Sequence, residues 1–256
     1  MKCNMSCRLN KVLIVGSAPD ANRIKSWDLS SFSTCLVINN AWKLTEKWNY
    51  LIHPEDMPKR NLPPENVGGD KKIITAREYV SEQNRFGGFV YGGGTMAFTA
   101  GYWALGALKP DMIAYVGCDM IYPENKDKKS HFYGKGEADP LRQDITLQSL
   151  EAKSARLMAL AHANHCRIVN LSELPESRLI FPRMPIQSFM LDYKPPTFSD
   201  DYKAGFNIDL IRKALKQEES LGYMVSSGRY WEVLEKFDAQ KLSAIDDIWM
   251  ASVVID

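Results

Sequence analysis

The chain has 256 residues, of which 45% are hydrophobic and 25% are charged, and its formal net charge at pH 7 is +1. These values are ordinary for a soluble globular protein, and the near-neutral charge argues against a nucleic-acid partner. No apolar run reaches the roughly 18 residues that a membrane-spanning helix needs. The first residues also lack the apolar core of a secretory signal. We therefore expect a cytoplasmic protein with no transmembrane segment, either free or peripherally associated with the inner face of the membrane.

The cysteine and histidine spacings do not form a metal or disulfide motif. The five cysteines are scattered, and Cys3 and Cys7 are too far apart for a C-x-x-C pair. Three of the cysteines lie in or beside predicted strands, where a free cysteine behaves as a small apolar residue. His162 and His165 form an H-x-x-H without a neighbouring carboxylate motif, so we expect no metal site there.

Six apolar runs alternate with polar and helical segments along the first two thirds of the chain. Continuous apolar runs, unlike alternating ones, are typical of strands that are covered on both faces of a parallel sheet. The predicted strands are 11–16, 35–39, 50–53, 72–75, 112–117 and 167–170. Apolar spacing predicts helices over 95–108 and 147–163, the first of them ended by Gly106 and Pro110. This order predicts an α/β fold with a doubly wound, mostly parallel Rossmann-like sheet.

The sequence changes character after Leu174. Prolines interrupt it at positions 175, 182, 185, 195 and 196, and helical patterns then cover 208–218 and 230–238. We expect a Rossmann-like domain over 1–174 and a mixed helical and irregular C-terminal extension over 175–256. The extension is a lid, a substrate-binding segment or an oligomerisation arm. Its many aromatic residues either line a site or pack the extension onto the core.

Two predicted strand ends carry polar turns. Gly16, Ser17 and Ala18 follow the first strand, where a tight turn lets backbone amides approach a phosphate. The turn is neither G-x-G-x-x-G nor a Walker loop, and its alternative is a plain strand-to-helix turn. Asn39 and Asn40 follow the second strand. An asparagine amide suits a nucleobase edge or a sugar hydroxyl, and the alternative is a pair that stabilises a local turn.

Three further segments carry candidate chemistry. Gly93, Gly94 and Thr95 precede the helix over 95–108, where backbone amides at the helix N-terminus can bind an anion. The alternative is a flexible glycine loop before an N-capping threonine. Gly117 and Asp119 close the fifth strand. The carboxylate there would hold a ribose hydroxyl, a base or a metal, or cap the following turn. His131 lies in the polar loop 130–134, and histidine is the side chain best suited to move a proton near neutral pH. Its alternative is a surface histidine.

In this order the motifs resemble the bacterial sialyltransferases of glycosyltransferase family 42. They also resemble a related group of domains that includes flagellin-modification accessory factors and a pterin diphosphokinase. The resemblance covers roughly residues 10–172. The matching segments are 11–19, 39–40, 93–95 with 104–106, 115–119 and 130–134.

The resemblance implies a sugar transfer from a CMP-activated donor to a glycan hydroxyl, without a metal. Ser17, Asn39, Gly94 and Thr95 would bind the nucleotide, and His131 would be the general base for the acceptor. Tyr122 or Tyr133 would donate a hydrogen bond to the departing phosphate. The Gly-Ser-Ala-Pro and Gly-Gly-Thr segments depart from the family's usual Gly-Asn-Gly-Pro and Ser-Gly. The donor sugar is therefore open among sialic acid, Kdo, another nonulosonate and no donor sugar at all.

Two other functions remain open from the sequence. A related diphosphokinase acting on a pterin-like substrate would need Mg²⁺, held by Asp119. A non-catalytic binding or assembly protein would need neither a nucleotide nor His131. The absence of a D-x-D motif near a strand end favours the transferase over the kinase. The expected partners are a nucleotide-sugar donor and a glycan acceptor, and the tail aromatics would suit a homo-oligomer.

Overall fold

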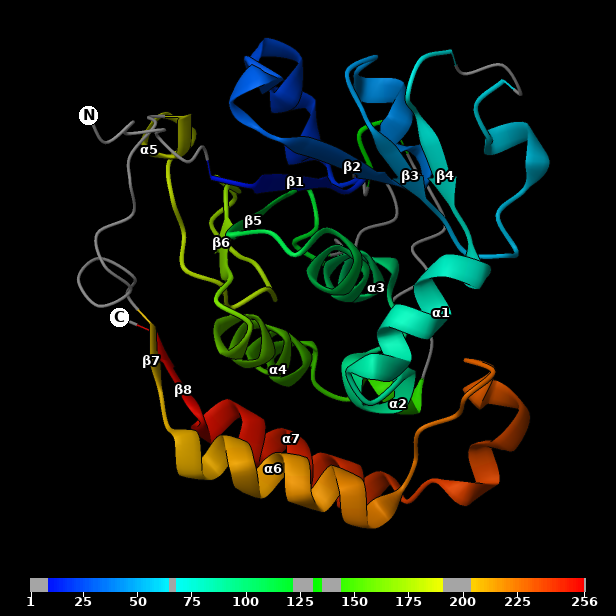
Figure 1. The fold of residues 1–256 in the computed structure, drawn as a ribbon, viewed down its shortest axis with the longest axis vertical. Helices are drawn as coiled ribbons and strands as arrows, with labels where there is room; N and C mark the ends of the chain where they lie inside the picture. Colours follow the sequence, from blue (N-terminus) through cyan, green and yellow to red (C-terminus); the bar gives the residue numbers. More distant parts are fainter. Residues whose placement is uncertain (1–8, 65–67, 122–130, 135–143, 191–203, 256) are drawn as a thin grey trace, which may run out of the picture.

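The computed structural model describes residues 9–64, 68–121, 131–134, 144–190 and 204–255. A six-stranded sheet runs in the order β4-β3-β2-β1-β5-β6, and every neighbouring pair in it is parallel. Figure 1 shows this sheet with helices on both sides. The strands are β1 (Lys11–Val15), β2 (Thr34–Ile38), β3 (Tyr50–Ile52), β4 (Lys72–Ile74), β5 (Met112–Val116) and β6 (Arg167–Asn170). All six predicted strands and the Rossmann-like α/β fold are confirmed.

Burial on both faces explains the continuous apolar runs. Every residue of β1 and of β5 is buried. Alternate side chains of β1 enter two different cores, Val12 and Ile14 on one face and Leu13 and Val15 on the other. From β1 the chain adds β2, β3 and β4 on one side and then returns to add β5 and β6 on the other side. In open α/β sheets, ligands bind at the strand ends beside this switch point, which here lies between β1 and β5.

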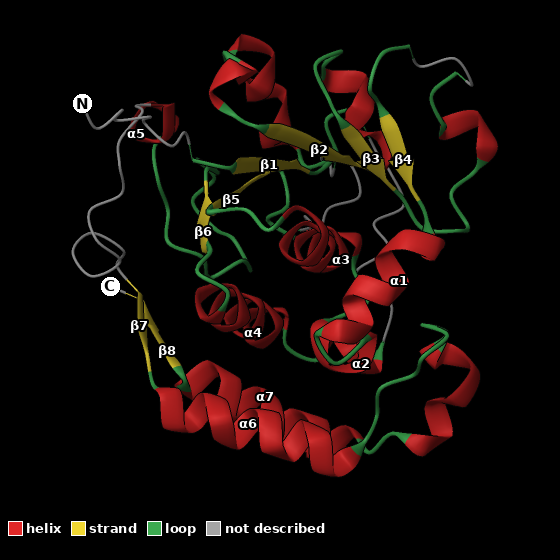
Figure 2. Cartoon of the chain, viewed as in Figure 1, coloured by secondary structure: helices red, strands yellow, loops and turns green. Residues whose placement is uncertain are grey.

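Helices cover both faces of the sheet (Figure 2). On one face lie α1 (Ala76–Arg85), α3 (Met96–Trp103) and α4 (Leu150–Ala163), whose apolar side chains share a core with the sheet. On the other face lie three short 3₁₀ helices and one short α-helix, which form the second core. These are η1 (Pro19–Ser26), η2 (Leu29–Ser31), η3 (Asn39–Leu44) and α5 (Ile186–Met190).

The helix predicted over 95–108 is present, but it ends differently. Thr95 caps α3 by accepting a hydrogen bond from the Phe98 amide, and the helix continues as a π-helical turn, η5 (Ala104–Leu108). The prediction that Gly106 ends the helix is wrong. Gly106 lies inside η5, where a Cβ atom would stand 2.0 Å from a Glu82 carboxylate oxygen, so it serves close packing on α1. The left-handed residue that ends the helix is Lys109, with a φ of 47°.

Residues just after the predicted boundary at Leu174 complete both cores. Leu179 and Phe181 join the core on the α3 side, and Ile186 and Phe189 join the core on the η1 side. The Phe189 ring stacks on Phe32 with 5.0 Å between the ring centroids. The first part of the extension therefore packs against the sheet.

The last part of the chain forms a third layer beneath α4 (Figure 1). It contains α6 (Ile208–Leu221) and α7 (Ala239–Ala251), flanked by the antiparallel strands β7 (Ala204–Phe206) and β8 (Val253–Ile255). The helix predicted over 208–218 is confirmed and extends to Leu221. The helix predicted over 230–238 is present in part: residues 230–236 form the 3₁₀ helix η8 (Tyr230–Lys236), which is kinked at Val233, and Asp238 is already the N-cap of α7.

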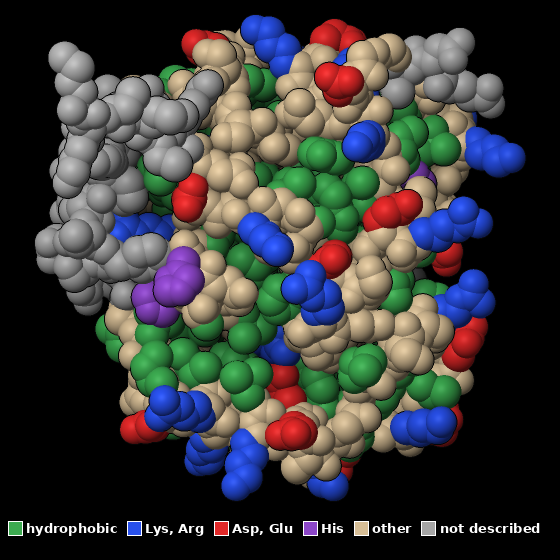
Figure 3. Space-filling model, in the orientation of Figure 1, with side chains coloured by type: hydrophobic (Ala, Val, Ile, Leu, Met, Phe, Trp, Pro, Cys, Tyr) green, Lys and Arg blue, Asp and Glu red, His purple; other side chains and the backbone are tan. Residues whose placement is uncertain are grey.

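Two buried ion pairs join the third layer to α4. Lys153 Nζ lies 2.6 Å from Asp246 of α7, and Arg156 Nη2 lies 2.7 Å from Glu218 of α6. All four side chains are buried. Within the part of the chain that the structure describes, no helix has the length and apolarity to cross a membrane. Figure 3 shows one face of the molecule, on which charges of both signs alternate with small hydrophobic patches.

Candidate functional site

The turn after β1 is bonded to the end of β5. The Gly16 amide donates to the Val116 carbonyl and the Ala18 amide donates to the Gly117 carbonyl, both at 2.9 Å. A Cβ atom at Gly16 would stand 2.2 Å from the Gly117 carbonyl oxygen. Gly117 has a φ of +69°, and a Cβ atom there would lie 2.5 Å from the Ala21 Cβ. Both glycines therefore allow the two strand ends to meet at the point where the strand order reverses.

Asn39 and Asn40 follow β2 directly, as the sequence predicts. Asn39 has a left-handed backbone with a φ of 52°. The Oδ1 atoms of both side chains are buried and have no hydrogen-bond partner among the described residues. An unsatisfied buried acceptor costs about 1–3 kcal/mol, so two such atoms side by side in sequence need an explanation. A ligand with N–H or O–H groups would satisfy them.

Asp119, on the opposite side of β1, has the same property. Its side chain is 1% exposed. The Oδ1 atom accepts from Asn170 Nδ2 at 3.4 Å, and Oδ2 has no partner in the described parts of the chain. Because β2 and β5 both adjoin β1, their ends lie about 10 Å apart. Asn39, Asn40 and Asp119 thus follow the two strands that lie on either side of β1.

The loop that carries His131 lies against the same turn. The Phe132 amide donates to the Ser17 carbonyl at 2.9 Å, and residues 131 and 134 pair as a short antiparallel bridge. The imidazole stacks on Tyr133 with 4.9 Å between the ring centroids. Partial burial lowers the pKa of His131 below its usual 6.5. The long-range contact from Phe132 to Ser17 brings two separately predicted motifs together.

Of the two predicted tyrosines, Tyr133 lies in the part of the chain that the structure describes. Tyr133 is 46% exposed and lies beside His131. Tyr122 lies outside the described residues, so its predicted contact with a departing phosphate stays a prediction.

The glycine turn before α3 is contacted by residues that the sequence analysis did not single out. The Gly94 amide donates to Thr146 Oγ1 at 2.9 Å, and Thr146 Oγ1 donates to Asp144 Oδ1 at 2.7 Å. The Tyr230 hydroxyl donates to Asp144 Oδ2 at 2.6 Å. A Cβ atom at Gly94 would stand 2.5 Å from the Tyr230 hydroxyl oxygen. Asp144 caps the short 3₁₀ helix Ile145–Leu147, and an aspartate at this position is a local signal that a sequence can show. The sequence does not predict that Thr146 then contacts Gly94.

Close packing around Gly93 also leaves no room for a side chain. It has a φ of +89°, and a Cβ atom would lie 2.8 Å from the Phe98 ring. No hydrogen bond among the described residues joins the glycine turn to the β1 turn. The structure thus brings the β1 turn, the end of β5 and the His131 loop into direct contact, and places the glycine turn at the N-terminus of the helix that leads to β5.

Two further findings bear on the chemistry of the site. Within the described ranges, no group of three or more His, Cys, Asp or Glu residues has the arrangement of a metal site. Cys118, beside Gly16, is buried, and burial raises the pKa of its thiol far above the usual value. That thiol is therefore unreactive at neutral pH.

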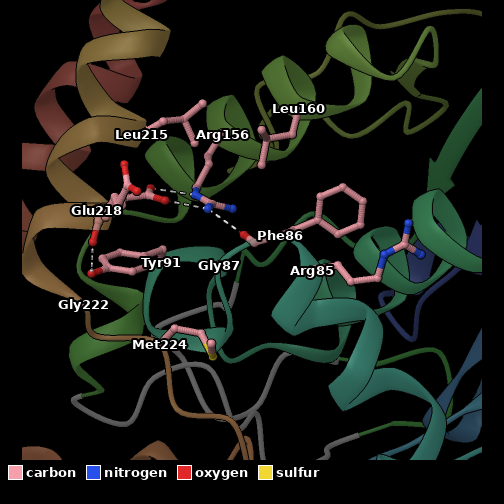
Figure 4. A pocket seen from close by; sticks show the side chains of 11 residues that line it. Arg85, Phe86, Gly87, Tyr91, Arg156, Leu160, Leu215, Glu218, Gly222 and Met224 are labelled. Atoms are coloured by element: carbon pink, nitrogen blue, oxygen red, sulfur yellow. Dashed lines mark hydrogen bonds and ion pairs between the residues drawn. The ribbon is translucent and has the colours of Figure 1, made fainter.

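A separate cavity of about 390 Å³ lies between α1, α4 and α6, away from the strand ends (Figure 4). Arg156 points toward Glu218 and the Phe86 carbonyl in this view, and Tyr91 points toward the backbone of Glu218. These groups satisfy one another, with Nε and Nη2 of Arg156 at 2.8 and 2.7 Å from the two carboxylate oxygens of Glu218. The cavity floor is therefore a structural ion pair.

Comparisons with family models, with curated proteins and with solved structures find no match to this chain. The resemblance to glycosyltransferase family 42 stays a prediction, and the argument for function is carried by the geometry of the strand ends.

Proposed function

We propose that the protein is a metal-independent glycosyltransferase that moves a sugar from a CMP-activated donor to a glycan hydroxyl. The observation that carries this proposal is the set of buried acceptor oxygens without partners on both sides of the β1 turn, from Asn39, Asn40 and Asp119. A cytosine amino group and ribose hydroxyls are donors that would satisfy such atoms. Fold-level analogy supports the same site, because ligands of open α/β sheets bind where the strand order reverses.

His131 is the general base of the proposed reaction. Its lowered pKa leaves the imidazole neutral at pH 7, which is the form of histidine that acts as a base. The acceptor oxygen attacks the anomeric carbon as the bond from that carbon to the CMP phosphate oxygen breaks. The proton of the acceptor hydroxyl passes to His131, and CMP leaves with the bonding electrons. Donors for the phosphate are the Gly94 backbone amide, once it is released from Thr146, and the Tyr133 hydroxyl, with Tyr122 proposed for the same role.

Calorimetric titration with CMP, CTP, ATP and GTP, with and without Mg²⁺, tests the proposal. We expect CMP to bind equally well in the presence and absence of the metal. The Asn39→Ala variant should bind CMP about tenfold or more weakly, because one ligand hydrogen bond is lost in a buried site. The His131→Ala variant should keep CMP affinity and lose turnover with a CMP-sugar donor. Weak or absent CMP binding by the unaltered protein would refute the proposal.

A second candidate function rests on the unpartnered Oδ2 atom of Asp119. A carboxylate oxygen in this position would also bind Mg²⁺ with its remaining ligands from water and a triphosphate, as a diphosphokinase acting on a pterin-like substrate requires. The same titration separates the two, because triphosphate binding that disappears with EDTA would select the kinase. The absence of binding to all four nucleotides, with His131 tolerant of change, would favour a non-catalytic binding protein.

A further inference from the structure

The contacts around Gly94 suggest how access to the proposed nucleotide site is regulated. The backbone amide that a ligand phosphate would use is already occupied, since it donates to Thr146 Oγ1. Thr146 is completely buried, and its hydroxyl and amide are both bonded to Asp144 Oδ1. The amide, the hydroxyl and the carboxylate thus form one continuous chain of hydrogen bonds.

The charge of Asp144 strengthens this arrangement. The N-terminus of α3 carries the positive end of the helix dipole, and Asp144 reaches the adjoining glycine turn through Thr146. A carboxylate in this position takes the electrostatic role that a phosphate would take. It would also repel an incoming phosphate at short range.

The C-terminal layer closes the arrangement. Tyr230, the first residue of η8, is 6% exposed and donates to the second carboxylate oxygen of Asp144. Its hydroxyl oxygen stands over Gly94, where a Cβ atom would approach it to 2.5 Å. Tyr230 therefore covers the glycine turn and holds Asp144 in place at the same time.

We propose that Asp144, Thr146 and Tyr230 form an internal cap on the glycine turn that a ligand phosphate must displace. This inference rests on the proposed function, because it concerns phosphate access to the same site. Binding of the phosphate breaks the bond from Gly94 to Thr146 and frees Tyr230 from Asp144. Nucleotide affinity is thereby lowered in the resting protein, and binding is coupled to the release of η8 from the glycine turn.

The test uses two variants that each remove one hydroxyl while keeping the shape of the side chain. Thr146→Val frees the Gly94 amide, and Tyr230→Phe frees one oxygen of Asp144. Matched controls are Thr146→Ser, which keeps the hydroxyl, and Tyr223→Phe, whose hydroxyl accepts from the Asp238 amide instead. Each protein is titrated calorimetrically with CMP, cytidine and inorganic pyrophosphate, after thermal unfolding has confirmed that it is folded.

We expect Thr146→Val and Tyr230→Phe to bind CMP and pyrophosphate about three- to tenfold more tightly than the unaltered protein, the effect of one hydrogen bond. Cytidine affinity should not change, because cytidine has no phosphate. Both controls should behave as the unaltered protein does.

The other outcomes are distinct for the two proposals. Equal CMP affinity in all five proteins, or weaker binding by Thr146→Val, overturns the cap and leaves the proposed function standing. Pyrophosphate binding by Thr146→Val that the unaltered protein lacks, with no CMP binding by either, supports the cap and overturns the proposed function. The absence of both CMP and pyrophosphate binding in every protein overturns both.

Discussion

Removal of one partner from the buried Arg156–Glu218 pair should strongly destabilise the protein, and Glu218→Ala tests this. The Glu218 carboxylate accepts from Arg156 Nε at 2.8 Å, from Arg156 Nη2 at 2.7 Å and from Trp249 Nε1 at 2.8 Å. Arg156 is 1% exposed and Glu218 is 5% exposed. Truncation to alanine would leave a guanidinium charge and an indole N–H in the interior without their acceptor.

The expected loss in the free energy of unfolding comes from the charge and the N–H group that Glu218→Ala leaves unpaired in the interior. Removing one member of a buried pair costs about 3–5 kcal/mol, and an unsatisfied buried donor such as the Trp249 N–H adds about 1–3 kcal/mol. The total is about 4–8 kcal/mol, which overlaps the lower part of the usual range of domain stability, about 5–15 kcal/mol. For a chain of this size, such a loss lowers the Tm by about 8–32 °C. The bonds from Arg156 to Tyr102 and to the Phe86 carbonyl are neutral and do not replace the lost charge.

Urea unfolding, monitored by circular dichroism, measures the change in the free energy of unfolding. The control is Asp209→Ala on the same helix, since the Arg212–Asp209 pair has side chains 75% and 93% exposed and should contribute about 0–1 kcal/mol. The double variant Arg156→Met with Glu218→Leu should recover about 2 kcal/mol or more of the loss. If Glu218→Ala and Asp209→Ala cost the same, the pair is not the buried, dehydrated contact described above, and the reasoning fails.

Three further predictions concern the strand ends. Gly117→Ala, which adds a Cβ atom 2.5 Å from Ala21 to a residue with a φ of +69°, should lower the free energy of unfolding by about 1–3 kcal/mol or more; Gly68→Ala, with no atom within 4 Å, should lose less in the same urea titration. Asn40→Ala should leave the free protein as stable or more stable, because it removes an unsatisfied buried oxygen, and should weaken CMP binding in calorimetry. Because burial lowers the pKa of His131, the base is lost by protonation as the pH falls through a value below 6.5; the acidic limb of kcat/KM should lie there, and a limb above pH 6.5 would argue against His131 as the base.

The fold was predictable because its signals are local and redundant. Each run such as Lys11–Val15 is apolar at every position, and burial on both faces of a parallel sheet is the physical reason for that pattern. The capped start of the helix at Thr95 was likewise local. The end of that helix was not, because the π-helical turn at Gly106 depends on Glu82 of a neighbouring helix.

The candidate site was only partly predictable for the same reason. Residues that directly follow strands, such as Asn39 and Asp119, meet at one edge because the strands are parallel, and this rule can be applied to a sequence. The hydrogen bond from Tyr230 to Asp144 joins residues 86 positions apart, and the bond from Gly94 to Thr146 joins residues 52 positions apart. No periodicity or spacing encodes such a contact, and it arises only when the third layer packs against α4.

Two sets of contacts determine how much of the structure moves when a phosphate displaces the cap: the hydrogen bonds around Gly94, and the packing of α6 and α7 against α4. Release of Thr146 and Tyr230 breaks a few hydrogen bonds, each with a net value of about 0.5–1.5 kcal/mol. Detaching α6 and α7 would also expose apolar side chains of the third layer such as Leu242 and Ile245, each of which contributes about 1.5–3 kcal/mol when buried. We therefore expect CMP to increase amide hydrogen exchange at Gly94 and around Tyr230 while α6 and α7 keep their protection. Loss of protection throughout α6 and α7 would instead indicate that the whole third layer moves.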